Sequence, residues 1–388
     1  MKREHHMEYD IFSSEHEQFR DQLRKFFADK VAPNCEEWDA KREIPRSIWK
    51  DMGEMGFLGF CYDPAYGGVG ADQLFRVVMA EELARSGVSG FGVSVAGHND
   101  MGTAYINLLG SDEQKKRWLV PCTTGEAVCA IAVTEPGAGS DVAAISTRAE
   151  KKGDGYVING QKTFITNGYY GDLMVVAVKT DTKAEPPFKG ISLVIVEKGT
   201  PGFTSSKLEK IGAHCSDTAE LFFEDVKIPK ENLLGEEGSG FYAIMQNFQL
   251  ERLVIAALSV ETAQLVLEKT IEYTKERSAF GKPISKFQVV RHKLVDMATE
   301  IELNRALVYQ CTRAYSQGQD VTREISMVKA ASGEMTNRVV YQATQLFGGY
   351  GYMSEYQVAR LYADVRAISI AGGTTEIMKE IIGRLMGI

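Results

Sequence analysis

The sequence has few cysteines, and their arrangement indicates neither a disulfide framework nor a metal site. The six are Cys35, Cys61, Cys122, Cys129, Cys215 and Cys311. They form no CxxC pair and no His/Cys ligand spacing, so neither bridging nor metal binding is predicted. Because free cysteine behaves as a small apolar residue, we expect reduced and buried thiols.

Membrane spans, targeting segments and basic surfaces are also missing from the sequence pattern. No apolar run approaches the ~18 residues that a membrane-spanning helix needs. The opening segment, MKREHHMEYDIFSS, is rich in acidic residues and has no apolar core, unlike a signal or transit peptide. Lys and Arg number 44 against 52 Asp and Glu, a formal net charge of −8, whereas a nucleic-acid-binding protein needs a basic stripe. A cytoplasmic protein without a nucleic-acid partner is expected.

The sequence does contain enough apolar residues, 44% of 388, for a sizeable core and two or three structural units. From about residue 14 to residue 117 the apolar residues recur at helical spacing. From about 130 to 226, short β-rich runs alternate with turn residues. Long helical patterns then return at about 239–277, 287–317, 321–346 and 354–362, and from Glu376 onward. A β unit between two helical units is therefore predicted.

The β unit carries two hairpin signals and one Gly-rich stretch. The hairpin signals are VING at 157–160 and ITNG at 165–168. The stretch AVTEPGAGSDVAA, at 132–144, follows a β run with glycines and with Thr134, Ser140 and Asp141. Glycines let the backbone approach a ligand and point N–H groups at phosphate. No GxGxxG opens a helix here, so this is not a Rossmann fingerprint, and such a loop alone is more often only a turn.

A second Gly-rich stretch, QLFGGYGYMSEYQVARLYAD at 345–364, reads on its own as a helix end. Taken together, the two stretches resemble the two signatures of the acyl-CoA dehydrogenase family. Four further segments are similar to that family, in order and over essentially the whole chain: GQKTFITNG, SDTAELFFEDVKIP, ERSAFGKPISKFQ and GGTTEIMKEIIGR.

The resemblance implies an α+β fold with an N-terminal all-α domain (1–129), a middle β-barrel or sandwich domain (130–236) and a C-terminal four-helix bundle (237–388). It also implies bound FAD, an acyl-CoA substrate, an electron-transfer flavoprotein as acceptor and a homotetramer. In the family, a carboxylate removes the α-proton of the thioester while the flavin removes the β-hydrogen as hydride, which gives the trans-2-enoyl-CoA. Such a base needs a dry site that raises its pKa, and the thioester oxygen needs pre-placed donors.

Two carboxylates compete for the role of base. Many family members carry the base in a YEGT motif, which, laid against IAGGTTEI, puts Gly372 at the glutamate position and Glu376 four residues further on. Glu376 is therefore expected to start a helix, capped by Thr374 or Thr375, and to contact the cofactor. The long-chain and isovaleryl subgroup carries the base in a helix similar to QLERLVIA, which places it at Glu251. Because Glu251 lies within an apolar stripe of helical period, it should be protonated, paired or functional; a buried ion pair with Arg252 or another nearby Arg is the alternative.

The resemblance also assigns cofactor and substrate contacts. Those implied for FAD are Ile131, Val133, Thr134, Ser140, Phe164, Thr166, Arg277, Phe280, Gln288, Gln345, Gly349, Thr374 and Glu376. Five of these resemble the set that reaches the FAD of a neighbouring subunit: Arg277, Phe280, Gln288, Gln345 and Gly349. Phe164 stands where many members have Trp. The acyl-CoA contacts implied are Ser140, Gln249, Arg252 and Gly373, and the Gly372 N–H is implied to donate to the thioester oxygen.

The segment SVAGHNDMG, at 94–102, falls where the family builds the deep end of its acyl cavity. His98, Asn99 and Asp100 are polar for an alkyl tunnel. One interpretation is a hydrogen-bonded cluster at a helix start, because Asn and Asp favour such positions. The other is that His98 and Asp100 bind a polar or cyclic acyl group.

Two functions besides that of a dehydrogenase are open at this stage. One is an acyl-CoA oxidase on the same fold. The other is a flavin-binding protein that has lost catalysis, since a fold does not by itself imply an activity. Acyl chain length and branching are not determined by the sequence.

Overall fold

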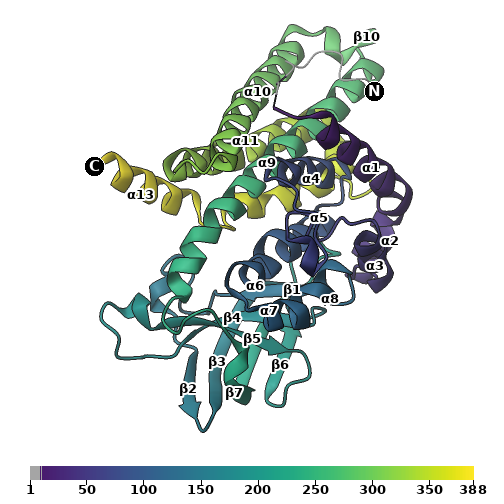
Figure 1. The fold of residues 1–388 in the computed structure, drawn as a ribbon. Helices are drawn as coiled ribbons and strands as arrows, with labels where there is room; N and C mark the ends of the chain where they lie inside the picture. The colour runs from purple at the N-terminus through teal and green to yellow at the C-terminus, as the bar shows by residue number, and fades with distance from the viewer. Residues whose placement is uncertain (1–8, 10) are drawn as a thin grey trace.

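The computed structural model describes residue 9 and residues 11–388. Most of the opening segment used above to argue against a targeting peptide, residues 1–8 and 10, lies outside the described residues. Helices from the first part of the chain, a sheet from the middle and long helices from the last part pack together, with the sheet at one end (Figure 1). The prediction of a β unit between two helical units is confirmed.

The first part of the chain is helical because its apolar residues recur on one face of successive helices. Phe26 packs edge-on against Phe57, and Phe27 against Phe91, in one buried cluster. The helices are α1 (Ser14–Lys30), α2 (Cys35–Lys41), α3 (Arg46–Glu54), α4 (Leu74–Arg85), α5 (Ser89–Ala96), α6 (Thr103–Leu109), α7 (Asp112–Gln114) and α8 (Val120–Thr123).

A π-helical segment, Gly97–Gly102, joins α5 directly to α6. His98, Asn99 and Asp100 therefore lie inside a continuous helical run, and the prediction that they start a helix is wrong. Asn and Asp favour helix starts when they accept from the free N–H groups of their own helix. Here the side chains bond elsewhere: the Asn99 amide accepts from Gly59 N (3.2 Å) and donates to Phe57 O (3.1 Å).

The middle of the chain forms a mixed sheet of eight strands, hydrogen-bonded in the order β6-β7-β3-β2-β4-β5-β8, with β1 added to β4. β1 runs parallel to β4, and β2 meets β4 in one parallel pair; the remaining pairs are antiparallel. The strands are β1 (Cys129–Ala132), β2 (Arg148–Lys152), β3 (Gly155–Thr166), β4 (Leu173–Lys179), β5 (Ile191–Glu197), β6 (Phe203–Lys207), β7 (Thr218–Pro229) and β8 (Leu233–Leu234).

Both faces of the central strand β4 are covered, which explains its continuous apolar sequence. Leu173 and Val175 belong to a cluster shared with helices, whereas Met174 and Val176 belong to a cluster on the other face. Side chains alternate between faces along a strand, so a strand buried on both sides has no place for polar residues.

Neither of the two sequence signals for a hairpin turn forms one. VING lies inside β3, where the pairing with β7 shifts register between Ile158 and Gly160. ITNG does end β3, and Asn167 has a left-handed φ of 60°. The following strand, β4, nevertheless pairs with β1, β2 and β5 instead of β3. Asn-Gly supplies a local bulge or turn, but the partner strands decide whether a hairpin forms.

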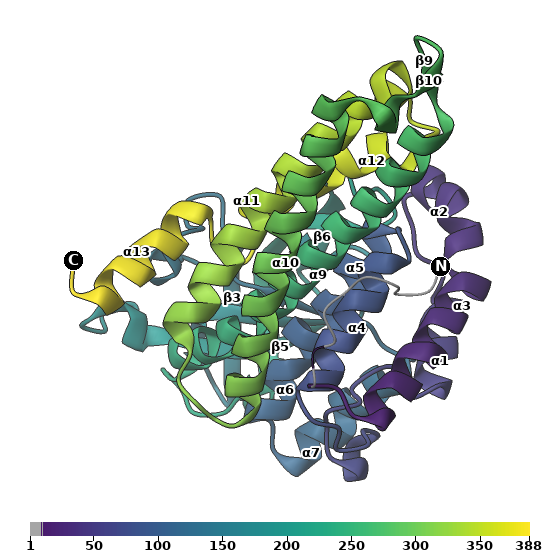
Figure 2. The same ribbon diagram turned by 90° about the horizontal axis from the view of Figure 1, so that it is seen from above.

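The last part of the chain forms long helices and one short hairpin. The helices are α9 (Gly240–Glu276), α10 (Gln288–Ser316), α11 (Thr322–Phe347), α12 (Gln357–Asp364) and α13 (Thr375–Met386). The hairpin between α9 and α10 consists of β9 (Ser278–Ala279) and β10 (Lys282–Pro283). α13 starts beside α11 and projects away from the rest of the molecule (Figure 2).

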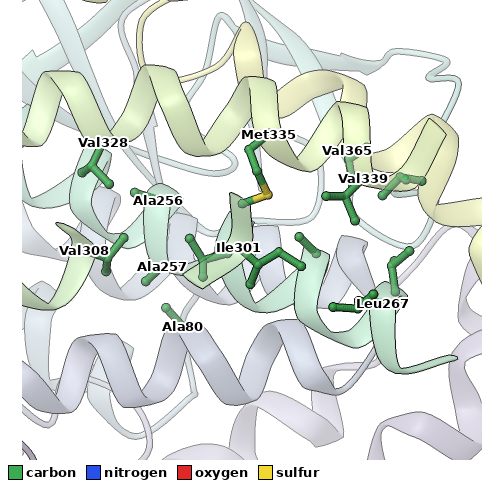
Figure 3. Close-up of a cluster of buried hydrophobic side chains, with 14 of the residues drawn as sticks. Ala80, Ala256, Ala257, Leu267, Ile301, Val308, Val328, Met335, Val339 and Val365 are labelled. Atoms are coloured by element: carbon green, nitrogen blue, oxygen red, sulfur yellow. The ribbon is translucent and has the colours of Figure 1, made fainter. Parts of the chain in front are cut away.

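Small side chains let the helices approach closely in the core of the bundle. Ala257 on α9 lies near Ala80 of α4, and Ala256 lies on the side of α9 toward α11, while Ile301 of α10 and Met335 of α11 fill the space between the helices (Figure 3). All five are buried to 4% exposure or less. Such interdigitation holds α9 rigidly, so the side chains on α9 have a well-defined position.

The described residues contain no disulfide, and all six cysteines are free, five of them buried. No group of three His, Cys, Asp or Glu within residues 11–388 is arranged to hold a metal ion. None of the described helices has the length and apolar character needed to cross a membrane.

Candidate active site

Glu251 lies where α9 passes from the sheet to the helical bundle. Ala243 and Ile244, nearer the start of α9, pack in the cluster that includes strands β4 and β5, whereas Leu250 and Leu253 pack in the bundle. Glu251 lies between Leu250 and Leu253, where the bundle part of α9 begins, and it is only 4% exposed. The sequence prediction that Glu251 faces the interior is confirmed.

Two neutral donors hold one oxygen of this carboxylate. The Tyr105 hydroxyl, from α6, donates to Glu251 Oε1 (3.0 Å), and Asn247 Nδ2, one turn earlier on α9, donates to the same atom (2.9 Å). Within the part of the chain that the structure describes, Oε2 takes part in no hydrogen bond. The arrangement therefore fixes the carboxylate through Oε1 and leaves Oε2 available to a reacting proton.

The surroundings of Glu251 raise its pKa to about 7, chiefly because burial disfavours the charged form, while the bonds from Asn247 and Tyr105 work in the opposite direction. Burial, together with the neighbouring Glu251, raises the pKa of Tyr105 well above its usual value, so its hydroxyl stays protonated and remains a donor. A carboxylate with a pKa near neutrality is a stronger base than an ordinary glutamate and is still ionised in a large fraction of molecules at pH 7.

The alternative of a buried ion pair with Arg252 is not what forms among the described residues. The Arg252 guanidinium points instead at the turn before α13, where its Nε donates to Gly372 O (3.3 Å). Arg252 is 4% exposed, and burial lowers its pKa despite the nearby Glu251 charge. Glu251 is thus left without a cation in direct contact, as a working base requires.

The Gly372–Gly373 turn lies against the face of α9 that carries Glu251. A Cβ added to Gly372 would come within 2.6 Å of Ile255 Cδ1, and Ile255 is one helical turn after Glu251. Gly372 and Gly373 have φ values of 65° and 98°, a region that side chains strongly disfavour. In the described chain the Gly372 N–H donates to no group, so the turn that packs against Ile255 carries a free donor.

Glu376 has the features of a helix-start residue. It is exposed in the first turn of α13, and Thr374 caps that helix by accepting from Ile377 N (3.2 Å). A hydrogen bond to its own backbone N–H, followed by one from Thr374, lowers the pKa of Glu376. A lowered pKa makes a carboxylate a weaker base, in contrast to Glu251.

Three domains of one family match successive parts of this chain. The acyl-CoA dehydrogenase N-terminal domain matches residues 13–126, the middle domain matches 130–226 and the C-terminal domain matches 238–387. The chain belongs to the acyl-CoA dehydrogenase family. The resemblance drawn from the motifs is therefore confirmed.

Individual relatives agree with this assignment. The mitochondrial long-chain specific acyl-CoA dehydrogenase of Sus scrofa is 44% identical over 375 residues, 96% of this chain and 87% of the relative. The mitochondrial isovaleryl-CoA dehydrogenase of Pongo abelii is 38% identical over 375 residues, 96% of this chain and 88% of the relative. The crystal structure of an acyl-CoA dehydrogenase from Geobacillus kaustophilus has a TM-score of 0.96 at 50% identity and covers 98% of this chain and 100% of that one.

Two other solved structures bear on the cofactor and the electron acceptor. An FAD complex of PigA has a TM-score of 0.93 at 30% identity and covers 98% of this chain and 99% of that one. A chain in a structure named for the electron transferring flavoprotein of Acidaminococcus fermentans has a TM-score of 0.93 at 37% identity, again over 98% and 99%. The family fold thus occurs with FAD and in connection with an electron-transferring flavoprotein.

The Gly-rich loop expected to bind FAD in this acyl-CoA dehydrogenase is open at its surface. A Cβ added at Gly137 would meet nothing within 4 Å, and Ser140 is exposed. The loop lies beside the end of β3, because Thr163 N donates to Thr134 O (2.9 Å). At that end Phe164 is 69% exposed, with a φ of 61°. An exposed aromatic ring beside free hydroxyls and open glycines fits a flat, phosphate-bearing cofactor.

A buried ion pair between β3 and the Gly-rich loop stabilises this loop. Lys162 Nζ donates to Glu135 Oε1 (2.8 Å) and to Val133 O (3.0 Å). Glu135 also accepts from Ser146 N (2.6 Å) and Thr147 N (2.9 Å). Burial opposes ionisation of Glu135, but the Lys162 charge prevails and lowers its pKa to about 2. The segment on either side of Thr134 is therefore held firmly.

The remaining predicted positions near this loop are Ile131, Val133 and Thr166, and all three are half-buried. Ile131 lies on β1 and Thr166 at the end of β3, with Val133 just beyond β1. The structure thus brings these predicted cofactor residues of the middle domain together where the ends of β1 and β3 lie beside the Gly-rich loop.

Five other predicted cofactor residues, those implied for the FAD of a neighbouring subunit, lie at the opposite end of α9. Arg277 follows its last residue, Phe280 is 95% exposed on the β9–β10 hairpin, and Gln288 begins α10. Gln345 lies in the last turn of α11, and Gly349 follows that helix. This end of α11 packs against α9 through Tyr273, whose ring stacks on that of Phe347 with the ring centroids 4.1 Å apart. From Glu251 to Glu276 α9 rises about 38 Å at 1.5 Å per residue. The two sets are thus well separated within one chain (Figure 1).

A cleft of about 480 Å³ lies between α9 and the connection from α10 to α11. Its walls include Met245, Gln249, Tyr315 and Gln319. Gln249 Oε1 is buried and has no hydrogen-bond partner among the residues that the structure describes, which is uncommon for a buried amide. The cleft opens on the α9 turn that precedes Glu251.

His98 and Asp100 are fully occupied by protein partners. His98 Nδ1 accepts from Cys129 N (3.0 Å), so its Nε2 carries the proton and donates to Cys122 O (3.2 Å). Burial lowers the pKa of His98 to about 4, which keeps the ring neutral. Asp100 forms a buried ion pair with Arg76. These bonds favour a supporting role over contact with an acyl group.

Sequence reasoning missed Tyr105, Asn247 and Lys329, whose ammonium group contacts the turn before α13. Asn247 had a usable signal, because a polar residue four positions before Glu251 shares its helix face. Tyr105 had none, since it is 146 positions away and reads as an ordinary core aromatic. Lys329 likewise lies in a helical apolar pattern, ISMVKAASG.

Proposed function

We propose that this chain catalyses the FAD-dependent α,β-dehydrogenation of an acyl-CoA thioester to the trans-2-enoyl-CoA, with Glu251 as the base that removes the α-proton. The observation that carries the proposal is the buried Glu251 carboxylate, held through Oε1 and without a cation in contact. Its pKa near 7 suits proton abstraction at neutral pH.

The free Gly372 N–H supplies the complementary function. Removal of an α-proton places negative charge on the thioester oxygen, and a fixed backbone donor stabilises that charge as it develops. The turn packs against Ile255, one helical turn after Glu251, and this supports a substrate whose carbonyl oxygen meets the Gly372 N–H while its α-carbon meets Glu251. FAD, when bound, accepts the β-hydrogen as hydride.

We assign the cofactor and substrate contacts as follows. The FAD of the same chain is held by the Gly-rich loop and the end of β3, through Thr134, Ser140, Phe164 and Thr166. Ile131 and Val133, at β1, and Thr374 and Glu376, at the start of α13, also contact it. Gln249 and Arg252 contact the pantetheine arm of CoA, an assignment supported by the unpartnered Gln249 oxygen beside the cleft. Gly373 and Ser140 complete the substrate contacts. The electron acceptor is an electron-transfer flavoprotein.

We propose a homotetramer, and the separation of the two cofactor sets supports the presence of at least a second subunit. No single dinucleotide reaches from the Gly-rich loop to the far end of α9, so Arg277, Phe280, Gln288, Gln345 and Gly349 act on the FAD of another subunit. Exposed apolar side chains on the same helical region supply an interface. They include Phe280, Val289, Val295, Leu303, Tyr352, Leu385 and Ile388. Since every cysteine is free, a reducing compartment such as the cytoplasm is the proposed location.

The test is anaerobic bleaching of the flavin absorbance by a panel of saturated acyl-CoAs. Glu251→Gln should abolish bleaching, because an amide does not remove the α-proton. Glu376→Gln, a matched change in the competing carboxylate, should still bleach whatever flavin it retains, because Glu376 is assigned to cofactor binding and not to proton removal. Bleaching in Glu251→Gln would refute the assignment of the base. A yellow wild-type protein that no acyl-CoA bleaches would indicate a flavin-binding protein without catalysis, and oxygen consumption with H2O2 formation would indicate an oxidase.

A further inference from the structure

Lys329 is a buried lysine without an ion-pair partner in the described chain. It lies on α11 and is 1% exposed, and its ammonium donates to the carbonyl of Gly373. Isolated buried ammonium groups are strongly disfavoured unless they are paired or hydrogen-bonded to good acceptors. Burial first, and then the Arg252 charge, lower the pKa of Lys329 to about 8, which leaves it mostly protonated at pH 7.

Two cationic side chains from two different helices thus donate hydrogen bonds to consecutive carbonyls of the same turn. Arg252 of α9 holds Gly372 O, and Lys329 of α11 holds Gly373 O. The charged groups around Lys329 are Arg252 from α9, Glu334 from its own helix and Glu376 from α13. Glu334 is itself occupied, since it accepts from Thr375 Oγ1 (2.7 Å).

A double-glycine turn needs such restraints to keep one conformation. Gly has more backbone freedom than any other residue, and two in succession leave four loosely constrained dihedral angles. The turn is anchored before the glycines by Ala371 N, which donates to Ala367 O (2.9 Å), and after them by the Thr374 cap. Between these points the two carbonyl contacts are the only hydrogen bonds that restrain the backbone within the described structure, in addition to packing against Ile255 and Met378.

We propose that Lys329 is a positioning residue, which fixes the Gly372–Gly373 turn so that the Gly372 N–H faces the substrate carbonyl beside Glu251. This inference rests on the proposed function of Gly372 as a donor to the thioester oxygen. Lys329 touches neither substrate nor cofactor and acts through the turn, with Arg252 as the second restraint. Displacement of such a donor by about 1 Å weakens a charge-stabilising bond enough to slow proton removal substantially.

The first test measures the turn directly. Lys329→Met removes the ammonium group and keeps most of the side-chain volume. Deuterium uptake of peptides covering residues 368–380 should be faster in this variant than in the wild type, measured on the flavin-loaded protein. The matched control is Lys210→Met, because Lys210 also donates to a backbone carbonyl, Ser216 O (2.7 Å), but in a different region. Lys210→Met should leave uptake of residues 368–380 unchanged.

The second test separates positioning from binding. At saturating acyl-CoA, the rate constant of flavin bleaching per bound flavin should fall roughly 10- to 100-fold in Lys329→Met. The acyl-CoA concentration that gives half-maximal rate should change by less than about threefold, by the uniform-binding criterion. In Lys329→Gln, which keeps an N–H donor, the rate constant of bleaching should fall less than in Lys329→Met.

A bleaching rate constant at the wild-type level in Lys329→Met, whether or not the turn exchanges faster, would overturn the inference. Equal losses in the Gln and Met variants would overturn the role of the donor. If Lys329→Met yields no folded protein, Lys329→Ala replaces it, and a wild-type rate together with unchanged deuterium uptake in that variant would likewise overturn the inference. Failure of the wild type to bleach would refute the proposed function instead, while the deuterium measurement would still report on the turn.

Discussion

At the scale of single residues, the chemistry depends on how Glu251 is surrounded. Burial raises its pKa toward neutrality, and the two donors to Oε1 limit that rise. Both donors are neutral, so they orient the carboxylate without neutralising it, as a lysine or arginine in contact would. The balance between desolvation and hydrogen bonding therefore sets the pH range in which the base is ionised.

Removal of one donor should shift this range. In Tyr105→Phe the ionised form of Glu251 loses a stabilising bond, so its pKa should rise above about 7 by on the order of one unit. Because the base must be deprotonated, the rise of bleaching rate with pH should move to higher pH. The rate at pH 7 should fall several-fold and recover by pH 9. The pH profile of the rate constant at saturating acyl-CoA is the measurement.

Tyr156→Phe is the matched control for this prediction. Tyr156 is also a buried tyrosine bonded to a glutamate, Glu237 (3.2 Å), but it lies on β3 away from the site. Its pH profile should match the wild type. An unshifted profile in Tyr105→Phe would mean that the Tyr105 bond does not influence the base.

At the scale of elements, the start of α13 connects the turn to the rest of the chain. α13 projects from the molecule and has only Thr375 and Met378 buried along its length. A short helix with little tertiary packing depends strongly on its cap and first turn. The Thr374 cap thus helps to hold both α13 and the end of the glycine turn.

Loss of this cap should loosen α13 locally. Thr374→Ala removes the acceptor for Ile377 N and should cost about 1 kcal/mol of helix stability. Hydrogen exchange of the α13 amides should accelerate by roughly fivefold, the equivalent of that free energy. Thr374→Ser keeps a capping hydroxyl and should exchange like the wild type. Equal exchange in all three proteins would show that subunit contacts, rather than the cap, hold the helix.

At the scale of the whole molecule, α9 spans the protein from the sheet to the far hairpin. Its 37 residues extend about 55 Å, and its core packing makes it a rigid rod between the two predicted cofactor sets. A charge placed on the far hairpin should therefore affect assembly without disturbing Glu251 directly.

Phe280→Asp should weaken the proposed tetramer. Phe280 is 95% exposed at a φ of 53° on the hairpin, and burial of a carboxylate in an apolar interface is unfavourable. Sedimentation should show smaller species, and the fraction of bound flavin should fall. Val69→Asp, at a 67% exposed position in the first helical part, should retain the wild-type mass. An unchanged mass for Phe280→Asp would exclude this end of the bundle as an essential interface.

The two buried glutamates should affect global stability in opposite directions. The pKa of Glu251 is about 7 in the folded chain against an ordinary value of 4.5. Its stabilising contribution is complete below pH 4.5 and lost as the pH rises through 7. Glu251→Gln should therefore be more stable than the wild type at pH 8, by on the order of 3 kcal/mol at 1.4 kcal/mol per pKa unit, and similar to it at pH 5.

Glu135→Gln provides the contrast. The pKa of Glu135 is lowered to about 2, so its contribution is present above pH 4.5 and lost only as the pH falls through 2. The variant leaves Lys162 buried and unpaired, and it should be destabilised by roughly 3 kcal/mol or more at both pH 5 and pH 8. Thermal unfolding midpoints at the two pH values test both variants. A stabilised Glu135→Gln would contradict this account.

Much of the fold and part of the site followed from the sequence. Helical and alternating periodicities predicted the helix, sheet and helix order, and the motif spacing predicted the family. The family resemblance pointed to Glu251 as the base, and its position within an apolar stripe supported that prediction. The domain boundaries at 129/130 and 236/237 and the cofactor contacts stay predictions. The hairpins at VING and ITNG were wrong because turn preference is local, whereas strand pairing depends on segments far along the chain.

The sequence by itself determined which residues could take part in binding or catalysis. They are the glutamate within an apolar stripe, the two successive glycines, and the capped start of α13. Those properties are local, because they arise from side-chain type, spacing and backbone freedom. Only the tertiary structure decided that Tyr105 reaches Glu251 across 146 positions and that Lys329 reaches Gly373 across 44. Such contacts depend on how α6, α9 and α11 pack against one another, and the packing of many buried side chains together sets that arrangement.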